Sequence, residues 1–424
     1  MIKFMSKAKN IILPALIFVS AFITYQFNAL GSVEHDFFKG FQKDSEALVF
    51  GGIVSSEQEV NNSKWFLGIL VDNNTNGVFW SNDSTEFTPW LERKPESLSF
   101  APYGSSVGIQ GYVYAVLRDT FKMDHVFDLQ NFPSALMALL VAGLYCLHLR
   151  LYGVLYAVLF ALTLVFSPWV AAISRNLYWS PFLWLLPLFF ATSAYLSKSR
   201  GVKFLCYLLI LLSFFIKSLC GYEYITSITI LACSPFILGP LFNGGSICDF
   251  KSAGVVFLMC VLGFSLAFLI HADKRGDGII SGIETIYKQD VKRRTYSDPS
   301  SFAPVYKDSL ISTPMNVLHS YTLQWRTPLF YGIDGAAFKN LILLALIGLL
   351  AKLVIARETF VRDVFLVLFM ALVPISWFVM AKGHSYTHTH INFVLWYFGF
   401  IPALLFVCTD TFISLINKLI KMRT

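Results

Sequence analysis

Short polar clusters interrupt an otherwise apolar chain, and each holds residues that could transfer a proton or bind an anion. In the first, Glu34, His35 and Asp36 come directly after the first apolar segment. A carboxylate that is partly desolvated at a membrane surface has a raised pKa and can act as a general base toward a hydroxyl group. We therefore predict that Asp36 or Glu34 is catalytic. The simpler interpretation is that both are solvated loop residues.

Later clusters combine cations with aromatic or acidic residues. Arg175 is flanked by aromatic residues, and its planar, always charged guanidinium suits a lipid phosphate. An interfacial anchor is the plainer interpretation. Lys217 lies near the end of an apolar segment, where it would snorkel to the surface or pair with an acid. A carboxylate at the depth of Glu223 is costly unless it is paired, so we predict that Lys217 or Arg175 is its partner.

The last cluster is a histidine-rich stretch at residues 384–390. His388 and His390 alternate, so an extended loop would let both bind zinc, but no carboxylate or cysteine is near in sequence. We predict that His384, Tyr386 and His388 contact phosphate or sugar instead, with no metal. The plainer interpretation is a polar loop with no role. The motifs of nucleotide-binding loops and of serine hydrolases do not occur, so an activated donor would have to be carried by a lipid.

A membrane must position these clusters. Hydrophobic residues make up 56% of the 424 residues and charged residues 14%, whereas a soluble domain has about 25% charged residues. The apolar runs are continuous and about 20 residues long, which predicts spanning helices and not barrel strands. The net charge of +7 is explained by basic residues on cytoplasmic connections, so the bilayer is an expected partner and nucleic acid is not.

We predict an all-α polytopic membrane protein in which residues 1–424 form a single domain with about ten spans. Lysines before the first span place the N-terminus in the cytoplasm, and an even number of spans places the C-terminus there too. Residues 106–118 predict an amphipathic helix lying on the membrane surface. The predicted order is a first span at 11–30, a large first extracytoplasmic loop at 31–130, spans two to seven at 131–271, a second long loop at 272–340, spans eight to ten at 341–409, and a cytoplasmic tail at 410–424.

The positive-inside rule supports this topology. The predicted cytoplasmic connections are short and basic, while the short outer connections carry few cations. The long loop at 272–340 is basic and lies outside, but long loops translocate largely regardless of their charge. Every polar cluster described above then lies on the extracytoplasmic side. We predict that a functional site, if there is one, faces away from the cytoplasm.

This arrangement resembles the GT-C superfamily of glycosyltransferases, which use polyprenyl-phosphate sugars. The resemblance rests on a retained first helix, the acidic residues Glu34 and Asp36 directly after it, a large first outer loop with interfacial helices, and many further spans. The chain is most similar to the bacterial Gtr-type enzymes that modify O-antigen of lipopolysaccharide and other surface polysaccharides. It departs from their usual adjacent acidic pair, because His35 separates the two carboxylates.

The resemblance implies an inverting hexosyltransferase of the bacterial inner membrane. It would move a hexose, expected to be glucose, from polyprenyl phosphate to a polysaccharide or lipid-linked glycan on the outer face. Asp36 or Glu34 would deprotonate the acceptor hydroxyl, and Arg175, with Lys217 or a histidine of residues 384–390, would stabilise the departing phosphate. No cofactor is expected, since cationic side chains can neutralise a monophosphate. The alternatives are a polysaccharide polymerase and, less favoured, a transporter or flippase of lipid-linked glycans.

Overall fold

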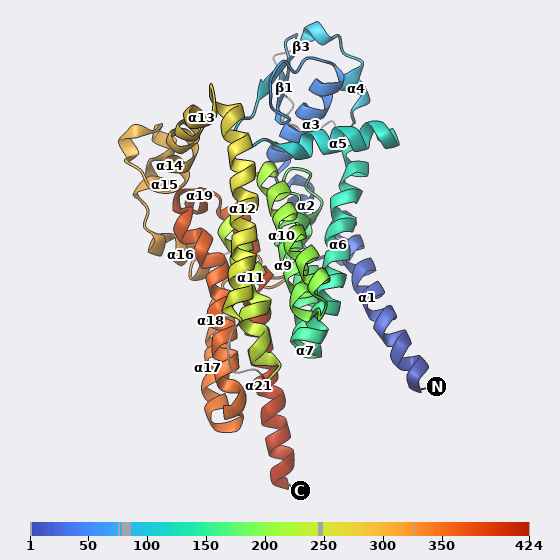
Figure 1. Ribbon diagram of the computed structural model, residues 1–424, viewed down its shortest axis with the longest axis vertical. Helices are drawn as coiled ribbons and strands as arrows, with labels where there is room; N and C mark the ends of the chain where they lie inside the picture. The colour runs from blue at the N-terminus through green and yellow to red at the C-terminus, as the bar shows by residue number, and fades with distance from the viewer. Residues whose placement is uncertain (1, 75–76, 79–85, 245–248, 326, 424) are drawn as a thin grey trace.

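The computed structural model describes residues 2–74, 77–78, 86–244, 249–325 and 327–423. Long helices run side by side in one bundle, and shorter elements gather at one end of it (Figure 1). We call this the loop end; it holds α2 to α5 and α13 to α16. The N- and C-termini both lie toward the opposite end of the bundle (Figure 1).

Seven helices in the described part of the chain are long and apolar enough to cross a membrane. They are α6 (Val126–Leu151), α10 (Arg200–Cys220), α11 (Ile225–Phe242), α12 (Phe250–Arg275), α17 (Ala337–Ile355), α18 (Arg357–Met380) and α21 (Phe400–Arg423). A bent pair, α7 (Val154–Phe166) and α8 (Pro168–Ser174), would add an eighth if it is one span. The chain is therefore mostly helical, as expected for a multi-pass membrane protein.

The bend of 65° between α7 and α8 has a local cause. Ser167 leaves helical geometry, and its hydroxyl accepts a hydrogen bond of 3.1 Å from the backbone N–H of Val170, which caps α8. Pro168 follows at the first helical position, where its missing N–H costs nothing, although its ring prevents α7 from continuing. A serine–proline pair therefore ends one helix and starts the next.

Two shorter apolar helices account for the remaining predicted spans. They are the apolar part of α1 (Ile2–Phe27), residues Ile11–Phe27, and α9 (Phe182–Leu196). Every segment predicted to span thus folds wholly or largely as helix, but the count of ten stays a prediction. The last span is placed differently from the prediction. Residues 393–398 form the 3₁₀ helix η5, and α21 continues through residues 410–423, which were predicted to be a tail.

A small antiparallel sheet at the loop end departs from the all-α prediction. Its strands are β1 (Gly68–Asp72), β2 (Gly77–Val78) and β3 (Leu98–Pro102), in the order β2-β1-β3. Helix α3 (Lys43–Glu57) packs closely on β1 because it carries two successive glycines. A Cβ at Gly51 would lie 2.2 Å from the Gly68 carbonyl oxygen, so no larger residue fits there.

The predicted surface helix is confirmed as a helix, α5 (Ile109–Phe121). It lies across the direction of the long helices at the base of the sheet (Figure 1). Val113, Val116 and Phe121 are exposed along it. An apolar exposed side on a helix perpendicular to the bundle is what a membrane-surface position requires, and that position stays a prediction.

Short elements complete the loop end and connect the long helices. After α1 comes α2 (His35–Gly40), and α4 (Thr88–Leu91) and η1 (Pro95–Ser97) precede β3. The second long loop holds α13 (Ile279–Ile286), the π-helical turn η2 (Tyr287–Val291), α14 (Lys292–Arg294), η3 (Pro299–Ser301), η4 (Pro304–Tyr306), α15 (Lys307–Ile311) and α16 (Pro314–Thr322). Between α18 and η5 lie α19 (Lys382–Thr387) and α20 (Thr389–Asn392).

An ion-pair network holds α17, α18 and α21 together at the end opposite the loop end. Lys352 pairs with Asp363 and, at 2.5 Å, with Asp410. Arg362 contacts the same two carboxylates at 2.7 and 3.3 Å. The side chains of Lys352 and Asp363 are fully buried. Two cations thus balance two anions, as burial in an apolar bundle demands.

We predict that Lys352→Met destabilises the protein by about 3–5 kcal/mol, because it leaves the Asp363 carboxylate buried with one cation fewer. Thermal unfolding of the purified protein in detergent measures the effect. Lys418→Met is the matched control, since Lys418 is half-buried and its ammonium makes an exposed hydrogen bond of 3.2 Å to the Val354 carbonyl. Adding Asp363→Leu to Lys352→Met should restore much of the lost stability. Equal unfolding temperatures for the two single variants would contradict the prediction.

Candidate functional site

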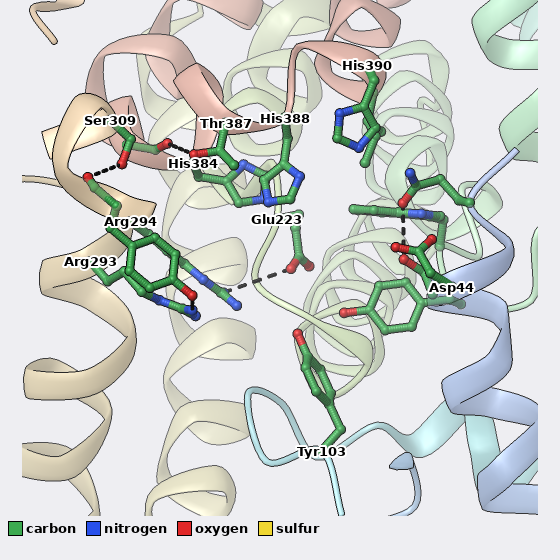
Figure 2. Close-up of a pocket in the computed structure, with 17 residues that line it drawn as sticks. Asp44, Tyr103, Glu223, Arg293, Arg294, Ser309, His384, Thr387, His388 and His390 are labelled. Atoms are coloured by element: carbon green, nitrogen blue, oxygen red, sulfur yellow. Dashed lines mark hydrogen bonds and ion pairs between the residues drawn. The ribbon is translucent and has the colours of Figure 1, made fainter. Parts of the chain in front are cut away.

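A cavity of about 360 Å³ lies at the loop end, among segments that are far apart in the chain. Its walls come from the start of α3, the β3–α5, α8–α9 and α10–α11 connections, α14 and α15 with the η4 turn between them, and α19 with α20 (Figure 2). The ionisable side chains in these walls are Asp44, Tyr103, Tyr178, Glu223, Arg293, Arg294, His384, His388 and His390. The site is therefore assembled by tertiary contacts and by no single motif.

Two consecutive arginines form one wall. Arg294 points toward Glu223, with 3.9 Å between Nη1 and Oε1 (Figure 2). Arg293 donates a hydrogen bond of 2.8 Å to the Tyr306 hydroxyl, and its other nitrogen lies 3.6 Å from Asp290. Burial alone would lower the pKa of Arg294, but Tyr103, Glu223 and Asp290 together raise it. The Arg294 guanidinium therefore stays charged within a largely buried wall.

A π-helical turn places these arginines. The turn Tyr287–Val291 leads directly into α14 and carries the buried Asp290. Asp290 lies 3.6 Å from both Arg275 and Arg293, and Ser105 donates a 3.3 Å hydrogen bond to it. Such turns insert one residue into a helix and re-aim the side chains that follow. Here the anchored turn directs Arg293 and Arg294 into the cavity.

Carboxylates stand at two places in the cavity. Glu223 is 8% exposed and lies in the short connection between α10 and α11. It lies close to the backbone of this connection, because a Cβ at Gly221 would come within 2.4 Å of a Glu223 carboxylate oxygen. Asp44, in the first turn of α3, is exposed and stands on the far side of the cavity from the arginines (Figure 2). Asp44 is therefore accessible to a ligand, whereas Glu223 is held beside Arg294.

Three histidines form the roof between the arginines and Asp44 (Figure 2). The rings of His384 and His388 are 4.4 Å apart, and those of His388 and His390 are 5.4 Å apart. Burial, the neighbouring rings and Arg294 lower the pKa of His384 well below its ordinary value and that of His388 to about 4. Burial also lowers the pKa of His390, and Asp44 opposes that shift. All three rings are neutral at neutral pH.

Two ring nitrogens in this roof are without a partner. The Nδ1 atoms of His384 and His388 are buried and make no hydrogen bond to any described residue. Buried polar atoms are almost always hydrogen-bonded in native proteins, either to protein or to ordered water. Neutral imidazoles in this position can donate to, or accept from, a polar ligand in the cavity.

Part of the sequence-predicted set is assembled in this cavity. Glu223, His384 and His388 line it, while Tyr386 is exposed outside its lining. Lys217 lies behind Glu223, where both border a separate void of about 10 Å³. Its ammonium group donates a 2.5 Å hydrogen bond to the Gly221 carbonyl. The ion pair of Glu223 is thus made with Arg294, where Lys217 or Arg175 was predicted.

The residues around α2 lie outside the cavity lining. Arg175 donates a 2.9 Å hydrogen bond to the Phe38 carbonyl and lies 4.0 Å above the Phe38 ring, so it fastens α2. Glu34 caps α2 by accepting hydrogen bonds from the backbone N–H groups of Phe37 and Asp36, which lower its pKa. A carboxylate with a lowered pKa is a weaker base. Asp36 is exposed in the first turn of the same helix.

Sequence reasoning did not single out Asp44, Tyr103, Arg293 or Arg294. The arginines carried a signal, because they are adjacent, follow an acid and lie in a loop predicted to be outside. The sequence around Asp44 carried no such signal, except that Asp44 lies soon after the first predicted span. Its position depends on the chain reversal at Gln42, where φ is +52° in the left-handed region. That reversal turns α3 away from α2 and brings Asp44 to the cavity.

No protein-family model, curated protein or solved structure matches this chain. Among the described residues, no group of three or more histidine, cysteine, aspartate or glutamate side chains is arranged to hold a metal ion. The inference of function therefore rests on the geometry of the cavity.

We predict that the protein loses stability as the pH falls from about 6.5 to about 4. In this range His388 and His384 bind protons in the unfolded state but stay neutral in the folded state, so acid favours unfolding. Unfolding temperatures in detergent across this window measure the loss. His388→Asn should flatten the pH dependence. The control is His319→Asn, at an exposed histidine of α16, which should leave it unchanged. An identical slope in wild type and His388→Asn would refute the prediction.

Proposed function

We propose that this cavity transfers a hexose from a polyprenyl phosphate to a glycan acceptor on the extracytoplasmic side of a bacterial inner membrane. The observation that carries the proposal is an arginine pair facing an accessible carboxylate across a cavity at one end of an apolar helix bundle. Such a cavity offers a site for an anionic leaving group and a base for a hydroxyl nucleophile. Both are what an inverting transfer from a lipid phosphate requires.

The arginines are suited to the leaving group. When the bond between the anomeric carbon and the phosphate oxygen breaks, its electron pair stays on the phosphate, whose charge increases. Arg293 and Arg294 are permanently charged and fork-shaped, so they can neutralise that charge through paired hydrogen bonds. Neutral His384 and His388, each with a partnerless buried nitrogen, can supply further hydrogen bonds. This charge neutralisation needs no metal ion, since the leaving group is a monophosphate.

Asp44 is the better placed base. The acceptor hydroxyl would lose its proton to the Asp44 carboxylate while its oxygen bonds to the anomeric carbon on the face opposite the phosphate. That geometry requires the base and the cations to stand on opposite sides of the sugar, as Asp44 and Arg294 do (Figure 2). Glu223 is unsuited to the role, because it is buried beside Arg294. Its function would be to orient that arginine.

An apolar groove next to the cavity suits the lipid chain of the donor. The groove encloses about 370 Å³ between α10, α11, α12 and α18. Ile225 and Met380 line it, and both are within a few residues of Glu223 and Gly383 in the cavity. A polyprenyl chain is wholly apolar, so it can pass from the bilayer into the groove at little cost in free energy, and van der Waals packing would hold it there. Phosphate and chain would then occupy adjoining sites.

A polysaccharide polymerase is the second candidate, and one observation favours it. The arginines come from the second long loop, and polymerases of lipid-linked glycans also rely on arginines of a late outer loop. The transferase is better supported, because the base and a wall of the cavity come from the first loop. A transporter has less support, since the charged clusters described above lie at the two ends of the bundle and not at mid-depth.

We predict that Asp44→Asn lowers hexose transfer by about 100-fold or more, as expected for the loss of a general base. Membranes containing the protein would be incubated with radiolabelled polyprenyl-phosphate hexose and a lipid-linked polysaccharide acceptor. Arg294→Gln should also lower transfer strongly. Asp36→Asn and Glu34→Gln are matched controls, since both side chains are exposed on the neighbouring α2.

The controls give the assay its power to discriminate. Transfer that survives Asp44→Asn and is lost in Asp36→Asn would return the catalytic role to the residue first predicted from the sequence. Transfer retained in all four variants, at equal expression, would reject the cavity as the active site. An absence of transfer in the wild type, with altered polysaccharide chain length in cells lacking the protein, would favour the polymerase.

A further inference from the structure

A second cavity, of about 540 Å³, lies at the loop end on the other side of the β3–α5 connection. It is bounded by α3, the loop at residues 61–66, α5 and the end of α12. We call it the aromatic cleft, after Trp65, Phe66 and Tyr112 in its walls. It shares no lining residue with the cavity of the proposed active site.

The loop that carries Trp65 is braced from several directions. The Asn61 amide donates a 2.8 Å hydrogen bond to the Trp65 carbonyl, and its oxygen accepts from both the backbone and the hydroxyl of Ser63. The Ser63 hydroxyl in turn accepts a hydrogen bond of 3.2 Å from the backbone N–H of Trp65. From α12, the Lys274 ammonium donates 2.8 Å to the Lys64 carbonyl. A preorganised aromatic loop loses little entropy when it binds a ligand.

Two glycines let this loop approach its neighbouring helices. A Cβ at Gly52 of α3 or at Gly111 of α5 would lie 2.0 or 2.1 Å from the Phe66 carbonyl oxygen. No other residue fits at either position without moving the loop. The cleft therefore has a floor made by the closest possible approach of α3 and α5 to residue 66.

The groups left available in the cleft match the chemistry of a saccharide. Trp65 is half-buried and Tyr112 is 53% exposed, so both offer ring surface. Around them Ser56, Glu59 and Lys64 are exposed and line the same space. A sugar ring has an apolar face of C–H groups that stacks on an aromatic ring, and hydroxyls at its rim that bond carboxylates, hydroxyls and ammonium groups.

A lipid phosphate fits less well. Lys274 is already engaged with the Lys64 carbonyl and with the Phe66 ring at 4.8 Å. The charge of Lys64 is matched by Glu59 in the same cleft, so the lining has little excess of positive charge.

The aromatic cleft is joined to the first cavity by a short chain of contacts. The Trp65 ring meets the buried His271 ring edge-on, with centroids 5.6 Å apart. His271 Nδ1 and the Tyr222 hydroxyl are 2.9 Å apart, and Tyr222 directly precedes Glu223. The two cavities are therefore neighbours at the loop end, linked through His271 and Tyr222.

We infer that the aromatic cleft binds the glycan chain of the acceptor, and this inference rests on the proposed function. Several sugar units would be held against Trp65 and Tyr112, with hydroxyls bonded by Glu59, Ser56 and Lys64. The terminal sugar would then lie in the first cavity with its hydroxyl toward Asp44. The cleft sets which glycan is accepted and takes no part in bond making.

Binding without any donor tests the inference directly. The protein would be purified in phosphatidylcholine nanodiscs and applied to an array of bacterial surface oligosaccharides of defined structure. We expect the wild type to bind a subset of them, Trp65→Ala to bind about tenfold more weakly, and Trp65→Phe to retain most of the affinity. Glu59→Gln, at an exposed side chain, should also weaken binding. Tyr331→Ala removes an exposed aromatic side chain of the second long loop. It is the control and should leave oligosaccharide binding unchanged.

Kinetics separate the cleft from the active site. With labelled donor, Trp65→Ala should raise the KM for the acceptor about tenfold and leave the KM for the donor and kcat unchanged. An unchanged acceptor KM in an active enzyme would overturn the cleft and leave the proposed function standing. Array binding that is lost in Trp65→Ala, with no transfer by the wild type, would reject the function and keep the cleft.

Further outcomes would overturn the inference. One is a wild type that binds no oligosaccharide. The other is a Trp65→Ala effect that appears only when phosphatidylglycerol is added to the nanodiscs, which would assign the cleft to a lipid headgroup. If Trp65→Ala proves poorly folded by size-exclusion chromatography, Glu59→Gln decides, with unaltered oligosaccharide binding as the contrary result.

Discussion

The ion pair between Glu223 and Arg294 joins the two halves of the site, because one residue closes the α10–α11 connection and the other belongs to the second long loop. At this depth neither charge is tolerable without the other. Asp290 likewise balances the charges of Arg293 and Arg275. It thereby anchors the π-helical turn that directs Arg293 and Arg294 into the cavity. The shape of the cavity therefore depends on charge neutralisation at the end of an apolar bundle.

The two ends of the bundle solve this problem differently. At one end Lys352, Arg362, Asp363 and Asp410 pair with one another. At the loop end the charges line a cavity, Asp44 is exposed, and buried histidine nitrogens are without partners. A closed network gives stability, whereas an incompletely satisfied one gives a place for a ligand.

The helices were predictable because their signal is local. Continuous apolar runs and the serine–proline pair at residues 167 and 168 mark where helices span and break. The small sheet was not predictable, because β1 and β3 are far apart in the chain. Neither strand alternates apolar and polar residues strongly enough to be recognised from the sequence. Within the site, Glu223 and the histidines were expected from their unusual depth and composition. Asp44 was not singled out, because nothing local distinguishes it from a solvated charge. The arginine pair carried only a weak local signal, and its partner Glu223 is distant in sequence.

The sequence by itself determined that the chain is helical, apolar enough for several membrane crossings, and punctuated by polar clusters between the helices. Those properties follow from composition and periodicity over about 20 residues. Only the tertiary structure decided which polar residues meet. The reversal at Gln42 separates Asp44 from Asp36, and Arg175 is used to fasten α2 through Phe38. The π-helical turn brings Arg294 to Glu223. A buried charge is stable only beside a partner, and here that partner comes from a distant segment of the chain.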